Sequence, residues 1–183
     1  MPTPRLDPNR TALLVVDLQD RLVPVMHEHE RLIRHAGRLI DGFNAMDLPV
    51  LVTEQYSKGL GPTVPELGRR LRTARCIQEK LKFTACVEPV RQELVASGAR
   101  SVVIAGIEAH VCVTQTALDL IEAGYITAVA VDATSSRRPE DRDTAIQRMI
   151  QAGVLPMTVE SVLFELVGEA GGDRFRSIRS IVT

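Results

Sequence analysis

The sequence predicts an α/β protein built on a doubly wound, Rossmann-like sheet of about six mainly parallel strands. In three places the end of a helix reaches a glycine and a short β-branched run follows almost at once, at Gly98, Gly124 and Gly153. Glycine suits the left-handed position that closes a helix. The spacing of these glycines is close to one strand–loop–helix unit, and the sequences between them differ. This pattern indicates a parallel α/β sheet and not a solenoid repeat.

The N-terminal half continues the same alternation. The uninterrupted apolar run 11–16 predicts a strand that is buried on both faces. Apolar residues at helical spacing predict a helix over 29–46, and residues 48–54 have the pattern of a second strand. A third strand is predicted over 74–80 despite its polar residues. The segment 54–68 is rich in Gly and Pro, which indicates a loop.

The C-terminal half supplies the remaining elements. The β-branched runs after the three glycines predict strands four to six. Pro139 and the acidic residues after it suit the first turn of a helix. Helices are predicted over 87–95, 139–150, 160–167 and 172–180. No linker divides the chain, so we expect one domain over residues 1–183.

Composition narrows the range of functions. The 22 Lys and Arg nearly balance the 23 Asp and Glu, which argues against a nucleic-acid or anionic-membrane binder. The N-terminus has no apolar signal core, and no apolar run approaches the roughly 20 residues that span a bilayer. The three cysteines, Cys76, Cys86 and Cys112, are therefore expected to be reduced thiols in a cytoplasmic protein. Neither a nucleic acid nor a membrane is therefore expected as a partner.

Polar residues stand at the predicted carboxyl ends of the strands. In a parallel sheet these ends open onto the same edge, so residues far apart in the sequence converge there. The residues are Asp17, Glu54, Gln55, Lys80, the segment Glu108 to Cys112, and Asp132. Glu54 and Asp132 are interpreted as structural residues that hold loops beside the site.

Cys112 is placed where a helix is predicted to begin. Unpaired backbone N–H groups and the positive end of the helix dipole favour a thiolate there and lower the thiol pKa from about 8.5. The alternative is a packing role, because free cysteine is among the most buried residue types. Cys76 and Cys86 have no such setting and are interpreted as packing residues.

Asp17 and Lys80 complete a possible catalytic set. A thiol nucleophile needs a base to take its proton and a cation to hold the thiolate. The alternatives are a helix cap for Asp17 and a solvated surface position for Lys80. Together with Cys112, the two residues form a set suited to attack on a carbonyl, with backbone N–H groups aimed at the developing oxyanion.

Three motifs resemble the isochorismatase-like cysteine hydrolases: "LLVVDLQD", "EKLKFTA" and "GIEAHVC". The likeness covers nearly the whole chain. It implies that Asp17, Lys80 and Cys112 form the triad, with Lys82 as the second choice for the lysine. It also implies an oxyanion hole from the backbone N–H groups of Glu108 and Cys112, a cis peptide bond before Glu108, and a homo-oligomer.

Four further residues are candidates for contact with substrate: Gln19, Tyr56, Phe83 and His110. Gln19 lies two residues after Asp17 and could reach across the cleft, although a surface position suits the residue type equally well. Tyr56, Phe83 and His110 would line the pocket. A single histidine on a turn is more often a local hydrogen-bonding residue, which is the alternative for His110.

Departures from the family pattern narrow the chemistry. Nicotinamidases in this family hold a metal with histidines after the second strand, but this chain has no histidine between His35 and His110. We therefore expect no metal, no other cofactor, and a substrate other than nicotinamide. The presence of Cys112 favours a small amide or carbamoyl compound that forms a thioester acyl-enzyme. The alternatives are vinyl-ether hydrolysis of the isochorismate type and a non-catalytic interaction protein that keeps the fold.

A nucleotide-binding domain has the same architecture but a different fingerprint. Its glycine-rich turn should follow the first strand, where this chain has "VVDLQDRL" without a glycine. The Gly-x-Gly at residues 59–61 follows the second strand instead. The sequence therefore favours the hydrolase over a nucleotide-binding protein.

Overall fold

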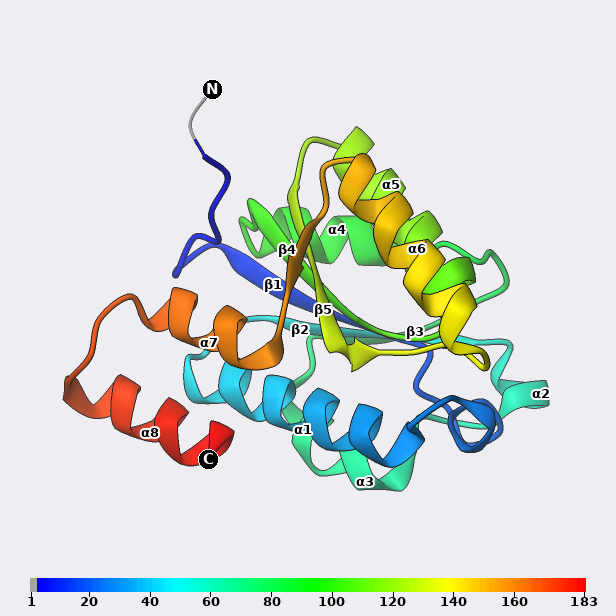
Figure 1. The fold of residues 1–183 in the computed structure, drawn as a ribbon, viewed down its shortest axis with the longest axis horizontal. Coiled ribbons are helices and arrows are strands. Elements are labelled where there is room, and N and C mark those ends of the chain that lie inside the picture. Colours follow the sequence, from blue (N-terminus) through cyan, green and yellow to red (C-terminus); the bar gives the residue numbers. More distant parts are fainter. Residues whose placement is uncertain (1–2) are drawn as a thin grey trace.

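Six parallel strands form the centre of the protein in a computed structural model, which describes residues 3–183 (Figure 1). Their order across the sheet is β3-β2-β1-β4-β5-β6. This order confirms the predicted doubly wound sheet. The strands are β1 (Thr11–Val16), β2 (Val50–Gln55), β3 (Cys76–Lys80), β4 (Ser101–Gly106), β5 (Ile126–Thr134) and β6 (Leu155–Met157).

Helices cover both faces of the sheet. One face carries α4 (Glu88–Ala96), α5 (Thr114–Glu122) and α6 (Pro139–Gln151) (Figure 1). The other face carries α1 (His29–Ala45), α3 (Pro65–Gly68), α7 (Val159–Val167) and α8 (Gly172–Val182). Short helices lie in the connections: η1 (Val23–Val25), α2 (Ser57–Leu60), η2 (Arg70–Thr73) and η3 (Ala109–Val113). Within residues 3–183, no helix combines the length and the apolar character needed to cross a membrane.

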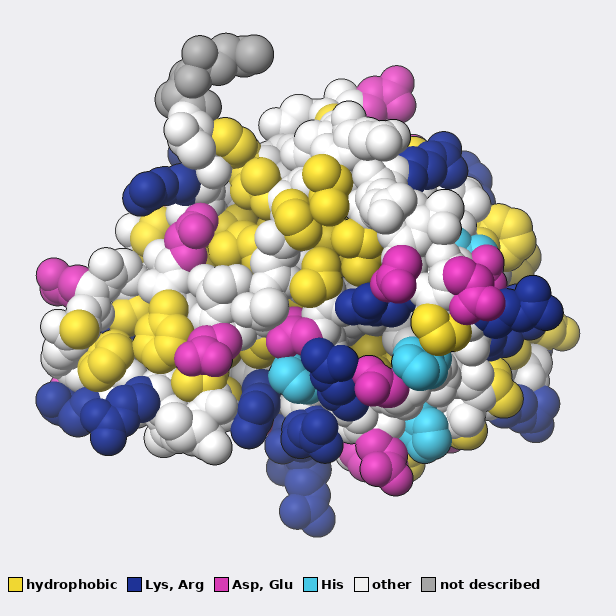
Figure 2. Space-filling model, in the orientation of Figure 1, with side chains coloured by type: hydrophobic (Ala, Val, Ile, Leu, Met, Phe, Trp, Pro, Cys, Tyr) yellow, Lys and Arg dark blue, Asp and Glu magenta, His cyan; other side chains and the backbone are white. Residues whose placement is uncertain are grey.

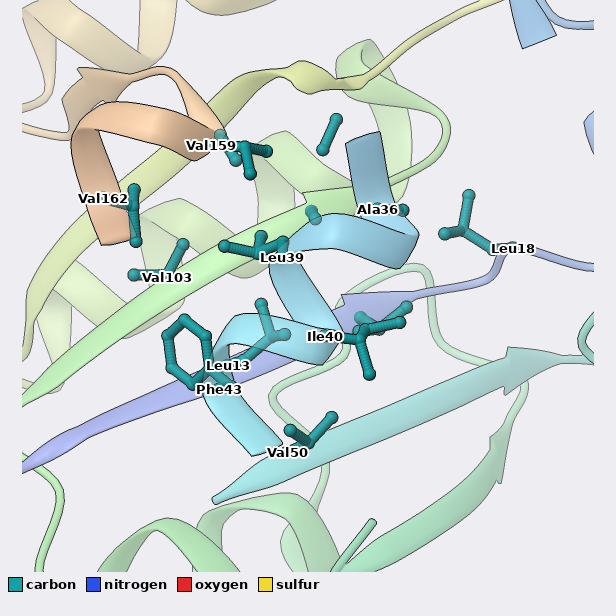
Figure 3. Packing of buried hydrophobic residues seen from close by; sticks show 14 of the residues in the cluster. Leu13, Leu18, Ala36, Leu39, Ile40, Phe43, Val50, Val103, Val159 and Val162 are labelled. Carbon is teal, nitrogen blue, oxygen red and sulfur yellow. The ribbon is translucent and has the colours of Figure 1, made fainter. Parts of the chain in front are cut away.

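The core explains why the central strands are apolar throughout. All six residues of β1 and of β4 are buried, since helices pack on both faces of these strands. On the α1 face, Leu39, Ile40 and Phe43 are fully buried and point at the sheet (Figure 3). Burying each such side chain stabilises the fold by about 1.5–3 kcal/mol.

The segment between β2 and β3 differs from its prediction. Residues 54–68 were expected to form a loop, but they include α2 and α3. Pro65 occupies the first turn of α3, where its missing N–H costs no hydrogen bond. Asp132 also lies within β5 and not after it. The irregular pairing between β4 and β5, which shifts register between Ile104 and Gly106, lets β5 extend beyond its expected end.

The strand order changes direction between β1 and β4. β1 pairs with β2 on one side and with β4 on the other, and the crossover connections leave the sheet on opposite faces. A crevice at the carboxyl ends of two such strands is the usual ligand site of an open α/β sheet. Asp17 directly follows β1 here, and the turn that leads to Cys112 follows β4.

Gly106, the last residue of β4, has a backbone conformation and a close neighbour that only glycine allows. Gly106→Ala is therefore expected to destabilise the protein by about 3 kcal/mol. Its φ of +130° is disfavoured for other residues, and an added Cβ would collide with the backbone of Val16 on β1. Urea unfolding would measure the loss. Gly68→Ala is the matched control, because a Cβ at Gly68 meets nothing within 4 Å. Equal stability of the two variants would contradict the expectation.

Candidate active site

Asp17 is fully buried at the carboxyl end of β1, in a left-handed conformation with a φ of 55°. Thr53 donates a hydrogen bond from its hydroxyl to Asp17 Oδ1 at 2.8 Å. The Lys80 ammonium donates to Asp17 Oδ2 at 2.7 Å. The carboxylate is therefore held by side chains of β2 and β3. Within residues 3–183, it accepts no backbone N–H of the kind that a helix cap would bind.

Lys80 is the last residue of β3, and its side chain is fully buried. Besides Asp17, its ammonium contacts three acceptors: Gln55 Oε1 at 2.7 Å, the Phe83 carbonyl at 3.0 Å and the Lys82 carbonyl at 3.2 Å. Burial of a charge is tolerated when a counter-ion and further hydrogen bonds compensate for lost water. Lys82, the second choice from the sequence, is exposed and contributes only its carbonyl oxygen.

Cys112 lies in η3, in the first helical turn after β4, and 7% of its surface is exposed. Burial raises the pKa of its thiol to about 12, and the negative charge of Asp17 adds to this rise. The positive charge of Lys80 acts in the opposite direction. The sequence-based expectation of a lowered pKa is therefore wrong, because loss of water around the sulfur and the charge of Asp17 outweigh the charge of Lys80.

The three groups are neighbours despite their distance in sequence. Both Asp17 and Lys80 lie close enough to Cys112 to act on its pKa: the carboxylate charge raises it and the ammonium charge lowers it. The arrangement keeps the thiol protonated beside a carboxylate that can accept the proton. The thiol proton would therefore pass to Asp17 while the sulfur attacks a substrate, and not before the attack begins.

The turn before Cys112 has the backbone form that the resemblance implies. The peptide bond between Ile107 and Glu108 is cis. The Ala109 N–H donates to the Ser135 carbonyl at 2.8 Å, and the Val113 N–H donates to the Glu108 carbonyl at 3.2 Å. These bonds fix the turn on both sides of the predicted oxyanion hole. The participation of the Glu108 and Cys112 N–H groups stays a prediction.

Gln19 is fully buried, which excludes the surface position considered from the sequence. Its side-chain amide donates to the carbonyls of Gln55 at 3.0 Å and Gly61 at 2.6 Å, and its oxygen accepts from the Gln55 N–H at 2.7 Å. Both amide hydrogens are thereby used inside the protein. Gln19 joins the end of β1 to the segment after β2, and a contact with substrate could use only its remaining oxygen lone pair.

Of the three other predicted pocket residues, Phe83 and His110 are close in sequence to Lys80 and Cys112, and Tyr56 contacts the backbone of Lys80. Tyr56 follows β2, donates its N–H to the Lys80 carbonyl at 3.0 Å, and is 50% exposed. Phe83 contributes the carbonyl that holds the Lys80 ammonium, while its side chain is 55% exposed. His110 Nδ1 lies 3.0 Å from Ser136 Oγ, which gives it the local hydrogen bond of the alternative interpretation. Their contact with substrate stays a prediction.

Sequence reasoning missed Thr53 and gave Gln55 no role, although both hold the ion pair. Thr53 and Gln55 contact Asp17 and Lys80, respectively. The available signal was a threonine in the buried run of β2, where a hydroxyl needs a partner. Thr116 was also missed: its hydroxyl donates to the Cys112 carbonyl at 2.6 Å and accepts from the Ala85 N–H at 2.7 Å.

Glu54 and Asp132 have structural contacts, in agreement with their interpretation. Glu54 accepts hydrogen bonds from the hydroxyls of Ser57 and Thr63 and from the Thr63 N–H, so it holds the segment that contains α2. Asp132 instead accepts from the Val159 N–H at 2.8 Å and lies 2.9 Å from His35 Nδ1. It therefore joins α1 and α7 to β5.

Residues 3–183 bring together no group of three or more His, Cys, Asp or Glu side chains suited to hold a metal ion. The expected absence of a metal and of any other cofactor remains a prediction.

The family model for the isochorismatase domain matches residues 11–161 of this chain. The chain belongs to the isochorismatase family. Isochorismatase domain-containing protein 1 of Salmo salar is 39% identical over 178 residues, which cover 97% of this chain and 62% of the relative. The chain thus spans less than two thirds of that relative's length.

Solved structures of the family have the same fold. The MAR1 ribonuclease of Caenorhabditis elegans is 38% identical, with a TM-score of 0.92 over 98% of this chain and 92% of its own. YcaC of Pseudomonas aeruginosa, solved with hexane-2,5-diol and covalent acrylamide, is 29% identical, with a TM-score of 0.91 over 99% of this chain and 93% of its own. YcaC of Escherichia coli, an octameric hydrolase of unknown specificity, is 31% identical, with a TM-score of 0.90 over 99% of this chain and 90% of its own.

Proposed function

We propose that the protein hydrolyses a small amide or carbamoyl compound, with Cys112 as nucleophile, Asp17 as base and Lys80 as the cation beside them. The observation that carries this proposal is the buried Asp17–Lys80 ion pair, with its 2.7 Å contact, at the strand ends next to a thiol that is not fully enclosed. A buried ion pair adds little net stability compared with apolar residues, which favours a functional reason for its position.

The reaction begins with coupled proton transfer and attack. Asp17 takes the thiol proton as the Cys112 sulfur bonds to the substrate carbonyl carbon, because the raised pKa leaves almost no free thiolate beforehand. Lys80 stabilises the negative charge on the sulfur and holds the carboxylate in place. The backbone N–H groups of Glu108 and Cys112 stabilise the oxyanion of the tetrahedral intermediate.

Three proton transfers then complete the cycle. Asp17 returns its proton to the leaving nitrogen as the carbon–nitrogen bond breaks, which leaves a thioester on Cys112. Asp17 next takes a proton from water as the water oxygen attacks the thioester carbonyl. The carbon–sulfur bond breaks, the acid leaves, and the proton returns to the thiolate. No cofactor takes part in these steps.

Two solved relatives support this proposal. The Pseudomonas aeruginosa YcaC structure contains covalent acrylamide, a compound that nucleophiles attack at its double bond, so that relative has a reactive nucleophile. The Escherichia coli YcaC is a hydrolase and an octamer. By similarity to it, we propose that this chain also assembles as a homo-oligomer.

RNA is the second substrate class to consider, because of the similarity to the Caenorhabditis elegans ribonuclease. The charge distribution favours a small molecule instead. The formal net charge is −1, and Figure 2 shows basic and acidic side chains interspersed on the visible face, without a continuous basic surface. Binding of an RNA backbone depends on concentrated positive charge.

A substrate panel tests the proposal. Small amides, carbamoyl compounds, isochorismate and an RNA oligonucleotide would each be incubated with the protein and with its Cys112→Ala variant. We expect release of ammonia or an amine from an amide or carbamoyl compound. In rapidly quenched samples, the mass of the protein should have risen by one acyl group. Turnover of isochorismate or RNA alone would overturn the proposal, and so would equal turnover by the Cys112→Ala variant.

A further inference from the structure

β3 is an edge strand whose outer side has no strand partner among residues 3–183. It pairs with β2 in parallel from Cys76 to Lys80, and β2 then pairs with β1. The Arg75 N–H donates to the Val50 carbonyl at 2.8 Å, so the ladder begins one residue earlier. Backbone groups alternate along a strand, and those of Cys76 and Gln78 consequently point outward. An open edge of this kind is a template for another strand.

The side chains along this edge form an ordered pattern. Cys76 packs with the core on the α4 side, and Lys80 points inward to Asp17. Alternation places Arg75, Ile77 and Glu79 on the opposite side, where all three are exposed. Ile77 is 56% exposed, which is high for an isoleucine in a strand. The edge therefore presents a positive, an apolar and a negative side chain in turn.

This pattern is complementary to itself. When two copies of the strand run antiparallel about a two-fold axis at Ile77, the two isoleucines face each other. Arg75 of each copy then faces Glu79 of the other, which gives two opposite-charge pairs. A shift of register that places Ile77 opposite Glu79 loses both the apolar contact and the charge pairs. Glu79 uses only Oε1 internally, as acceptor for the Ser57 N–H at 3.0 Å.

From this complementarity we infer that the edge of β3 is a homo-oligomer interface, in which it pairs antiparallel with β3 of a second copy of the chain. The exposed apolar side chains after the strand extend the same surface, with Leu81 75% exposed and Phe83 55% exposed. Isologous pairing joins two sheets into one, and it closes an edge that would otherwise promote uncontrolled association.

The interface would also stabilise the candidate site. The segment 81–84 supplies the Lys82 and Phe83 carbonyls to the Lys80 ammonium, and the Leu81 carbonyl accepts from Gln55 Nε2 at 2.9 Å. The backbone carbonyls of this segment thus bind the Lys80 ammonium in the interior, while the side chains of Leu81 and Phe83 are exposed to solvent. A second copy seated on those side chains would hold the segment against Lys80.

Charge reversal tests the interface. Arg75→Glu or Glu79→Arg alone places like charges opposite each other twice, and we expect self-association to weaken roughly tenfold or more in sedimentation experiments. The double variant Arg75→Glu, Glu79→Arg restores both opposite-charge pairs and is expected to recover the wild-type mass. Val95→Glu, at an exposed position on α4, is the control and should leave the mass unchanged.

A cross-link gives a second readout that does not depend on affinity. The two Ile77 residues would form a pair without direct backbone hydrogen bonds, with Cα atoms about 4.5 Å apart, which a disulfide can bridge. Oxidised Ile77→Cys protein is therefore expected to run as a covalent dimer on a non-reducing gel. Wild type and Val95→Cys should not.

The outcomes separate this inference from the proposals on which it builds. It rests on the proposed homo-oligomer but not on the proposed hydrolysis, since neither readout uses turnover. A monomeric wild-type protein would refute both the assembly and the interface. An oligomer that neither single charge reversal weakens, and in which Ile77→Cys forms no covalent dimer, would refute the β3 interface alone.

Discussion

Cys112→Ala is expected to lower turnover of the best amide or carbamoyl substrate by about 10⁴-fold or more. The reason is that the proposed covalent route needs the sulfur itself. Without it, Asp17 and Lys80 remain as an ion pair with no bond-forming group beside them. Steady-state kinetics would measure the loss. The acyl-enzyme mass should also disappear from quenched samples.

The matched control is Cys86→Ala. Cys86 is also buried, and its thiol pKa is raised to about 11 by burial, but neither Asp17 nor Lys80 acts on it. Loss of this sulfur should change stability through packing and leave the chemical step intact. If Cys112→Ala kept wild-type turnover, or if Cys86→Ala lost as much, the nucleophile would be another group.

Asp17→Asn is expected to have opposite effects on two properties of the site. Turnover should fall by about 10³-fold or more, because the base for the thiol and for water is lost. Alkylation of Cys112 by iodoacetamide at pH 7 should become faster. The negative charge of Asp17 raises the Cys112 pKa and Lys80 lowers it, so the neutral asparagine shifts the balance toward thiolate.

The sign of this pH effect follows from the thiol pKa. With a pKa of about 12, only about one Cys112 in 10⁵ is a thiolate at pH 7. Alkylation of the wild-type protein should then rise about tenfold per pH unit, without a plateau between pH 7 and pH 10. Each unit by which Asp17→Asn lowers the pKa increases the thiolate fraction about tenfold.

The fold should survive Asp17→Asn. Lys80 keeps the Gln55 side chain and the Lys82 and Phe83 carbonyls as acceptors. Asp132→Asn is the control, because that carboxylate lies in the contact between α1, α7 and β5 and should not alter Cys112 alkylation. Peptide mapping would separate Cys112 from the other thiols. Unchanged turnover in Asp17→Asn would exclude Asp17 as the base.

The fold was predictable from local patterns. The buried apolar runs of β1 and β4 and the three helix-closing glycines identify a parallel sheet covered on both faces, because burial on two sides leaves no polar positions in a strand. The short helices α2 and α3 were missed, since a segment rich in Gly and Pro has no helical periodicity.

The sequence by itself placed Asp17 and Lys80 at the ends of strands and Cys112 just after the turn that follows β4, since apolar runs and family motifs mark these positions. Only the tertiary structure decided how these groups affect one another. It surrounds the Lys80 ammonium with acceptors from three segments, uses the Gln19 amide inside the protein, and raises the Cys112 pKa where the helix start alone predicts a fall. The physical reason is that desolvation and hydrogen bonding depend on which distant residues surround a group, and local sequence does not contain that information.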